Sequence, residues 1–264
     1  NVQILSSNLV QNGDFSEEGV QEVSNGSFSQ EGVELVTNGD FATDSDWTLS
    51  GWNISGGSAN NDGINTGNIN QNIGLQQNKF YKISISITNY VSGALKVRLG
   101  TGNQITVGSS NGEYILYLEN TTTNPNIRFY PDATLNFQGS IDNVSVREVG
   151  QDWTLGTGWS IGEDKAVANT TGGTNGCLQT STITSGKIYK ATFEVLDYQS
   201  GSVRINLGGS GLTGVGNLVS ANGVYTQYIT SDGVDVYIQG RSGFIGSITN
   251  ISVKEVGQNW ELNT

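Results

Sequence analysis

The chain has 264 residues, and its 24 acidic residues outnumber its 12 basic ones, giving a formal net charge of −12. A surface of this charge repels nucleic acid and anionic membranes at long range, so neither is expected as a partner. The sequence contains no His, which excludes Ser-His-Asp and Cys-His catalysis. No apolar run approaches the roughly 18 residues that a membrane span needs.

A short motif recurs three times near the N-terminus, at residues 12–15, 25–28 and 38–41, in steps of 13 residues. Each copy begins with Asn-Gly, which favours a tight turn, and ends with Phe. A unit of this size is too small to bury its own core. Three explanations stay open: stacking between chains into a fibre-like stem, a flexible linker, or packing on the following module. Residues 1–34 are therefore predicted to form a stem or linker, with self-association into a trimer or fibre.

A second, longer repeat covers the rest of the chain. Trp47-Thr-Leu recurs as Trp153-Thr-Leu, 106 residues later, and the stretch 139–151 matches 246–258. Such a repeat predicts two homologous modules, the second without an Asn-Gly-Asp-Phe motif of its own. Trp260 repeats the opening of module 2 once more. The predicted domains are the N-terminal segment at 1–34, module 1 at 35–150, module 2 at 151–258, and the start of a third module or a tail at 259–264.

Strand signals follow one another along module 1. In residues 81–88, Ile alternates with Ser and Thr, and Leu and Val alternate with Lys and Arg in residues 95–99. Further strands are predicted at 114–118, 127–130 and 141–146. About eight short strands in a module of this length indicate an antiparallel sandwich.

Three motifs of module 1 resemble a known family. Residues 35–41 read Leu-Val-Thr-Asn-Gly-Asp-Phe, Gly51-Trp52 follows, and 141–146 read Ile-Asp-Asn-Val-Ser-Val. Together they resemble the galactose-binding-like jelly-roll modules that bind glucans and xylans in polysaccharide-degrading enzymes. The resemblance covers module 1 fully and residues 151–256 in part. It implies an all-β protein made of two tandem antiparallel jelly-roll β-sandwiches, preceded by a short β-repeat segment.

The arrangement of the repeats carries a second resemblance. Tandem Asn-Gly-Asp-Phe units that lead into Asp-Trp-Thr-Leu-Gly-Thr-Gly-Trp at 152–159 resemble virion fibre and adhesin proteins of bacterial viruses. This resemblance implies an extracellular or virion-surface location. The predicted function is that of a non-enzymatic structural or adhesive fibre protein whose modules attach to surface glycans. The alternative is the glycan-binding module pair of a secreted polysaccharide-degrading enzyme or of a bacterial adhesin.

Glycan-binding modules use aromatic faces and planar hydrogen-bonding side chains. The candidates are the outward-facing residues of these types on neighbouring strands. The alternative is that they are ordinary solvent-facing residues that pair across a sheet. The predicted ligand-binding residues are Lys96, Arg98, Tyr117, Arg128 and Tyr130 in module 1, and Arg204, Asn206, Tyr228, Tyr237, Gln239 and Arg241 in module 2.

The family resemblance also implies a structural calcium ion in module 1, held by Asp40 and Asp142 together with backbone carbonyls. Module 2 has Thr249 at the position of Asp142, so calcium is expected in module 1 only. No other cofactor is required. The lone Cys177 is predicted to be a small buried hydrophobe.

Overall fold

The computed structural model describes residue 12 and residues 16–134, 136–170, 176–180, 182–208 and 214–258. This part of the chain forms 18 β-strands and no helix, so it has no helix that could cross a membrane. The prediction of an all-β protein is confirmed. The chain divides into two compact units: residues 29–151 with 160–164, and residues 1–28 with 152–159 and 165–264. The N-terminal repeats are thus shared between the units.

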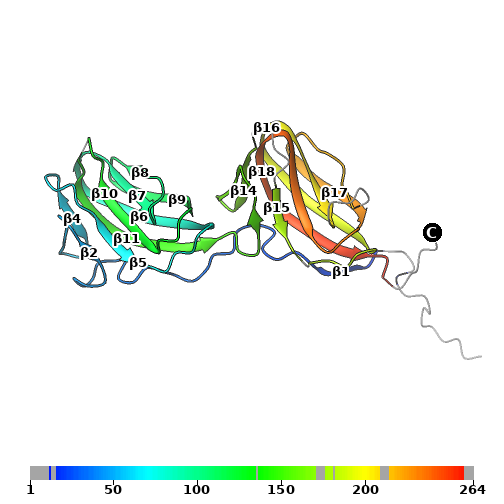
Figure 1. Cartoon of the computed structure of the whole chain (residues 1–264), viewed down its shortest axis with the longest axis horizontal. Coiled ribbons are helices and arrows are strands. Elements are labelled where there is room, and N and C mark those ends of the chain that lie inside the picture. The colour runs from blue at the N-terminus through cyan, green and yellow to red at the C-terminus, as the bar shows by residue number, and fades with distance from the viewer. Residues whose placement is uncertain are drawn as a thin grey trace, which may run out of the picture. The chain divides into compact units, whose positions relative to one another are not determined.

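Module 1 contains two five-stranded antiparallel sheets (Figure 1). Sheet I consists of β3 (Asn53–Ile54), β4 (Ala59–Asp62), β6 (Lys79–Ser92), β9 (Gly112–Asn120) and β11 (Gln138–Val149), in the order β3-β4-β11-β6-β9. Sheet II consists of β2 (Thr48–Leu49), β5 (Ile69–Asn72), β7 (Leu95–Leu99), β8 (Ile105–Gly108) and β10 (Asn126–Pro131), in the order β2-β5-β10-β7-β8.

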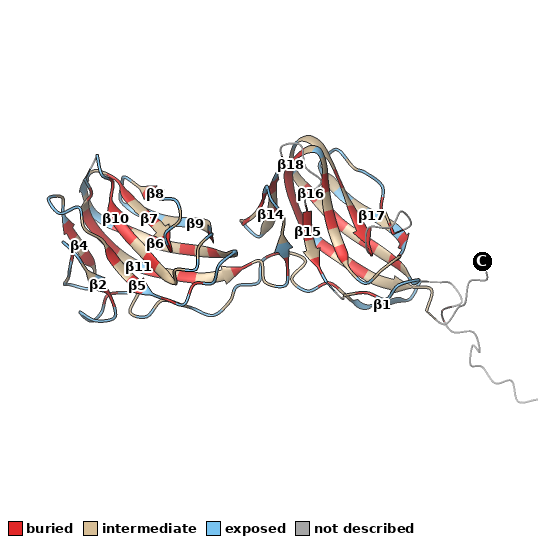
Figure 2. Ribbon diagram, viewed as in Figure 1, coloured by how far each residue is buried: buried red, intermediate tan, exposed pale blue. Residues whose placement is uncertain are grey.

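The core of module 1 lies between these two sheets. On β6, Ile83, Ile85 and Ile87 are at most 2% exposed, as the predicted alternation requires. Val97 of β7 and Phe129 of β10 are fully buried and face them from sheet II. Figure 2 shows the resulting alternation of buried and less buried positions along the strands. Every second residue of sheet II is thereby turned outward.

Module 2 has the same strand pairing with fewer interruptions. Its strands are β12 (Thr154–Leu155), β13 (Trp159–Gly162), β14 (Lys165–Asn169), β15 (Gly176–Gln179), β16 (Ile188–Leu207), β17 (Gly223–Thr230) and β18 (Val236–Val256). The start of β18 pairs with β15, and a later part of the same strand pairs with β14. Because β16 and β18 each run through both layers, the strands join into one eight-stranded sheet that includes β1 (Glu18–Gln21).

The third repeat belongs to module 1. Residues 31–41, here called lead A, run antiparallel to the second half of β11, which β4 leaves unpaired. The Leu35 amide donates to the Val146 carbonyl (3.0 Å), and the Val144 amide donates to the Gly39 carbonyl (2.8 Å). Lead A therefore extends sheet I along its open edge.

The shape of this repeat follows from the contacts of its turn. Phe41 is 1% exposed, and its ring centroid lies 5.3 Å from that of Trp47, whose indole Nε1 donates to the Asn38 carbonyl (3.0 Å). A Cβ on Gly39 would lie 2.0 Å from the Val144 carbonyl oxygen. Only glycine lets the lead approach the strand this closely.

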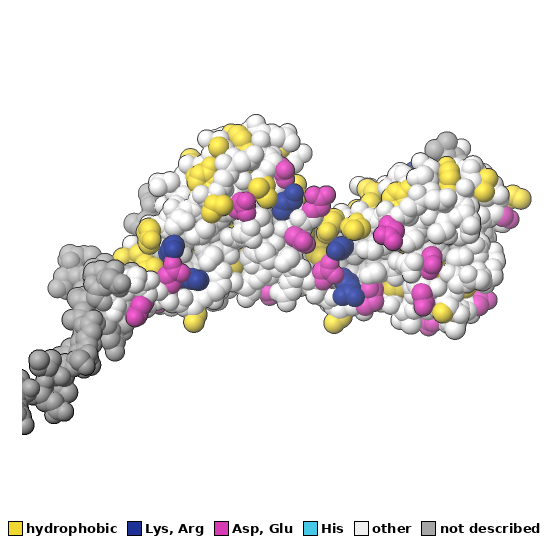
Figure 3. Space-filling view, turned by 180° about the vertical axis from the view of Figure 1, so that it is seen from behind, with side chains coloured by type: hydrophobic (Ala, Val, Ile, Leu, Met, Phe, Trp, Pro, Cys, Tyr) yellow, Lys and Arg dark blue, Asp and Glu magenta, His cyan; other side chains and the backbone are white. Residues whose placement is uncertain are grey.

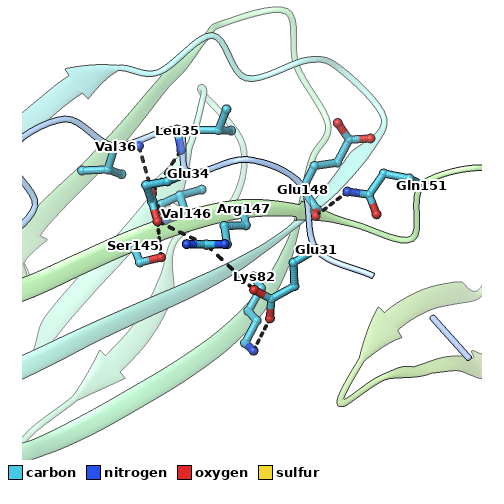
Figure 4. Close-up of polar contacts among 10 residues, drawn as sticks. All are labelled: Glu31, Glu34, Leu35, Val36, Lys82, Ser145, Val146, Arg147, Glu148 and Gln151. Atoms are coloured by element: carbon cyan, nitrogen blue, oxygen red, sulfur yellow. Dashed lines mark hydrogen bonds and ion pairs between the residues drawn. The ribbon is translucent and has the colours of Figure 1, made fainter. Parts of the chain in front are cut away.

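Two carboxylates of lead A hold it to the sheet (Figure 4). Glu34 accepts hydrogen bonds from the Val146 amide (2.9 Å) and the Ser145 hydroxyl (2.5 Å). Burial by itself raises the pKa of Glu34, but these hydrogen bonds outweigh it and lower the pKa below the ordinary value. Glu31 forms an ion pair with Lys82 of β6 (2.5 Å).

The second repeat belongs to module 2, although it precedes module 1 in the chain. Residues 18–28, here called lead B, run antiparallel to the end of β18. The Glu22 amide donates to the Val253 carbonyl (2.9 Å), and the Ile251 amide donates to the Gly26 carbonyl (2.9 Å). These bonds correspond to those of lead A.

The turn of lead B repeats that of lead A. Phe28 is 1% exposed and lies 5.2 Å from Trp153, whose Nε1 donates to the Asn25 carbonyl (3.1 Å). A Cβ on Gly26 would lie 2.0 Å from the Ile251 carbonyl oxygen. Module 2 thus has an opening motif after all, supplied from before module 1.

These contacts correct the predicted domain boundaries. Residues 18–34 are not a separate stem or linker, because they pair with strands of the same chain, and Val23 and Phe28 are buried there. The leads and modules follow a nested order: lead B, lead A, module 1, module 2. Apart from Asn12, the first repeat lies outside the described residues, as do Trp260 and the predicted segment 259–264.

Candidate functional site

A row of polar side chains crosses the outer surface of sheet II. Thr48 pairs with Asn70, Asn70 with Arg128, and Arg128 with Arg98, on four neighbouring strands. Their neighbours in the strands, such as Phe129, point into the core, so the row faces outward. Because adjacent strands lie about 4.8 Å apart, the row extends over about 14 Å.

The two arginines of this row are held in place. The guanidinium carbon of Arg98 lies 5.6 Å from the ring centroid of Tyr130, a cation–π contact. Arg128 donates from Nη1 to the Gly100 carbonyl (3.1 Å). The Nε of Arg98 is buried and has no hydrogen-bond partner in the part of the chain that the structure describes. A buried donor without a partner is unfavourable.

Lys96 lies on the same surface, opposite Tyr130 in the strand register. Its Nζ forms an ion pair with Asp132 (2.6 Å), which also accepts a hydrogen bond from the Thr134 hydroxyl (2.7 Å). Lys96 and Thr134 hold the pKa of Asp132 well below its ordinary value. Asp132 therefore stays ionised and neutralises Lys96.

The equivalent surface of module 2 has a similar composition. Asn206 pairs with Tyr237, and Arg204 with Gln239, whose Oε1 accepts from the Arg204 Nε (2.9 Å). Asn206 is 7% exposed, and its Oδ1 has no hydrogen-bond partner among the described residues. Burial, and then the charge of Arg241, lower the pKa of Arg204. The structure thus places two arginines close together on this surface.

All but two of the predicted ligand-binding residues lie on these two surfaces, which we call the arginine faces. The two faces occupy equivalent strands of the fold. The arginine face of module 1 comprises Lys96, Arg98, Arg128 and Tyr130, and that of module 2 comprises Arg204, Asn206, Tyr237, Gln239 and Arg241.

The other two predicted residues lie elsewhere. Tyr117 is on β9 of sheet I and pairs with Lys82, and Tyr228 is on β17 and pairs with Lys190. Each of these lysines forms an ion pair with a glutamate of a lead. Figure 3 shows a face on which dark-blue cationic side chains lie next to magenta carboxylates in both units. The structure therefore separates Tyr117 and Tyr228 from the arginine faces.

Sequence reasoning missed three polar residues of the module 1 face. Thr48 and Asn70 stand beside Arg128, and Asp132 neutralises Lys96. Asn70 lies in the sequence Ile-Asn-Gln-Asn, whose single apolar residue shows no alternation, and the burial of Gln71 appears only in the structure. Thr48 sits on a two-residue strand, which is too short to show a pattern.

The calcium prediction stays a prediction. Asp40 accepts from the Ala42 amide (3.3 Å), and Asp142 accepts from the Asn143 amide (2.6 Å). Among the described residues, no group of three or more Cys, Asp or Glu side chains is placed to hold a metal ion. In module 2 the Thr249 hydroxyl donates to the Ser27 carbonyl of lead B (3.2 Å).

Cys177 lies on β15 and is fully buried, as predicted. Burial raises the pKa of its thiol well above the ordinary value, so the thiolate is disfavoured. This thiol is a structural group of the module 2 core.

Comparisons with known proteins add no closer relative. No family model and no curated protein matches the chain. The N-terminal tandem CBM22-1–CBM22-2 domain of Paenibacillus barcinonensis Xyn10C is 13% identical, with a TM-score of 0.30, over 86% of this chain and 99% of that one. Allantoicase is 12% identical, with a TM-score of 0.30, over 88% of this chain and 93% of that one. Paenibacillus xanthan lyase is 15% identical, with a TM-score of 0.27, over 76% of this chain and 24% of that one. Likenesses this distant carry no argument about function.

Proposed function

We propose that the protein is a non-enzymatic extracellular glycan-binding protein, in which each module binds sugar on its arginine face. The observation that supports this most is the recurrence of buried, unsatisfied polar atoms on equivalent strands: Arg98 Nε in module 1 and Asn206 Oδ1 in module 2. A buried polar atom without a partner is unfavourable, and a sugar hydroxyl removes that cost by accepting from Arg98 Nε or donating to Asn206 Oδ1.

The chemistry of the faces suits a sugar. A pyranose presents hydroxyl groups that both donate and accept, and C–H surfaces that pack on aromatic rings. The module 2 face offers the partly buried ring of Tyr237, the acceptor of Asn206 and the donors of Arg204. Two such modules in one chain gain affinity for a polymer through multivalency.

A catalytic role has little support from the same residues. Glycoside hydrolysis by the common route needs two carboxylates that flank the bond. On the described surface of module 1, Asp132 is committed to Lys96 and a hydroxyl. The module 2 face, as defined, contains no carboxylate.

A glycan array probed with the full chain tests the proposal. Arg128→Gln combined with Arg204→Gln is expected to reduce binding at least about tenfold, because each change removes charged hydrogen bonds. Tyr117→Ala combined with Tyr228→Ala is the matched control and is expected to bind like the parent. The reverse pattern would move the site to the other sheet, and a chain that binds nothing on the array would refute the function.

The second part of the proposal is the setting, a virion or cell-surface fibre that self-associates. It rests on the sequence resemblance of the repeats, and on Val20 and Val33, which stand at equivalent positions of the leads and are 75% and 78% exposed. Apolar side chains exposed in this repeated way favour contacts with another chain. Light scattering over a range of concentrations tests this, and a strict monomer would argue against it.

A further inference from the structure

We infer that the arginine faces select an anionic glycan, one that carries uronate or sulfate groups, over its neutral counterpart. This inference rests on the proposed function and adds the class of ligand. The reason is that the few arginines of an acidic chain gather on these two surfaces.

The distribution of charge is uneven. The chain has a formal net charge of −12, yet each arginine face has a net charge of +2. In module 1 this is the charge of Lys96, Arg98 and Arg128 together with that of Asp132, and in module 2 it is the charge of Arg204 and Arg241. Four of the five arginines of the sequence lie on the faces. If the cations served only solubility, they would be expected to spread among the acidic residues.

Several cations outside the faces pair with carboxylates of the leads. Arg147 forms ion pairs with Glu31 and Glu34, and Lys190 and Lys254 with Glu18, so these cations hold the leads. Within the described residues, none of the four face arginines forms an ion pair with a carboxylate. Their charge is left for a partner from outside the molecule.

The geometry fits an anionic group. A guanidinium presents parallel N–H donors that match a carboxylate or sulfate in a bidentate manner. On the module 1 face, Arg98 and Arg128 stand opposite each other on adjacent strands, within reach of one anion. On the module 2 face, Arg204 lies opposite Gln239, two positions from Arg241 along β18, and the charge of Arg241 contributes to lowering the pKa of Arg204. A bound anion would offset this repulsion.

Neutral side chains on the same faces distinguish a glycan from a simple ion. The Oδ1 of Asn206 needs a donor, which an anion lacks and a sugar hydroxyl provides. Asn70 and Thr48 extend the module 1 row away from the arginines. The faces therefore present charged and hydroxyl-binding positions side by side.

The test uses polysaccharide pairs that differ in charge on a similar backbone. Polygalacturonate is compared with its fully methyl-esterified form, and a carrageenan with agarose, by affinity electrophoresis and calorimetry with the full chain. Duplex DNA serves as a polyanion without the sugar-hydroxyl pattern. Arg98→Gln combined with Arg128→Gln is compared with Arg147→Gln, a change of the same kind outside the face.

The expected result is binding of at least one charged member at least about tenfold tighter than its neutral partner, weakening with added salt. The face variant is expected to lose most of this preference, while Arg147→Gln keeps it. Equal or tighter binding of the neutral partners would overturn the inference and leave the proposed function standing. No binding to any polysaccharide would overturn both, and DNA binding as tight as that of the glycans would overturn the inference.

Discussion

Replacing Phe28 by Ala is expected to destabilise module 2 and to leave module 1 nearly unaffected, although residue 28 immediately precedes module 1 in the chain. Phe28 is 1% exposed and packs on Trp153 at 5.2 Å between ring centroids. Phe41→Ala is the matched control, because Phe41 has the same exposure and packs on Trp47 at 5.3 Å. The two changes remove the same group from opposite modules.

The size of the effect follows from the burial. Truncating a buried Phe to Ala typically costs about 3–5 kcal/mol. At about 1.4 kcal/mol per factor of ten, the open form of module 2 becomes about a hundred to several thousand times more populated. Lead B also exchanges two hydrogen bonds with the side chain of Gln179 on β15, at 2.9 and 2.8 Å from Ser24. A lead B that detaches from the module therefore loses its hydrogen bonds to β15.

The single cysteine of the chain provides the assay. Cys177 lies on β15 of module 2 and is fully buried, so a thiol reagent reacts only when this module opens. The rate of labelling in mild urea is measured for the parent and both variants. Phe28→Ala is expected to accelerate it in proportion to the open population, and Phe41→Ala to change it little.

Two results would refute this reasoning. One is equal labelling rates in Phe28→Ala and the parent, which would mean that lead B does not stabilise module 2. The other is acceleration by Phe41→Ala that matches or exceeds the effect of Phe28→Ala. That outcome would mean that the two leads do not act on separate modules, whereas the first would return the second repeat to the predicted stem or linker.

Two further predictions concern the leads. Gly39→Ala is expected to destabilise module 1 by at least about 1–3 kcal/mol in thermal unfolding, because the new Cβ would meet the Val144 carbonyl; an unchanged Tm would contradict the close approach. Hydrogen bonds from Lys190 and Lys254 lower the pKa of Glu18 below 4.5, so its contribution to stability is complete above pH 4.5 and is lost as pH falls through the lowered value. Urea midpoints of module 2 are expected to fall between pH 6 and pH 3 more steeply for the parent than for Glu18→Gln, and equal slopes would disprove the linkage.

Much of the candidate site could be predicted from the sequence. Alternation along β7 and β10 turns Arg98 and Arg128 outward, because the core side of each strand is filled by apolar residues. What alternation cannot give is the partner strand. Tyr117 also alternates outward, but β9 belongs to sheet I, so this residue is separated from the arginines.

The sequence by itself determined the strands, the two modules and the three copies of the Asn-Gly motif, because these depend on local patterns and on repetition. Only the tertiary structure decided which repeat belongs to which module. A short strand carries no local signal for its partner, since any open edge offers the same backbone groups. In the structure Phe28 packs on Trp153 and Phe41 on Trp47, while lead A occupies the open edge of β11. Lead B therefore supplies module 2 with the opening motif that is missing from its own stretch of sequence.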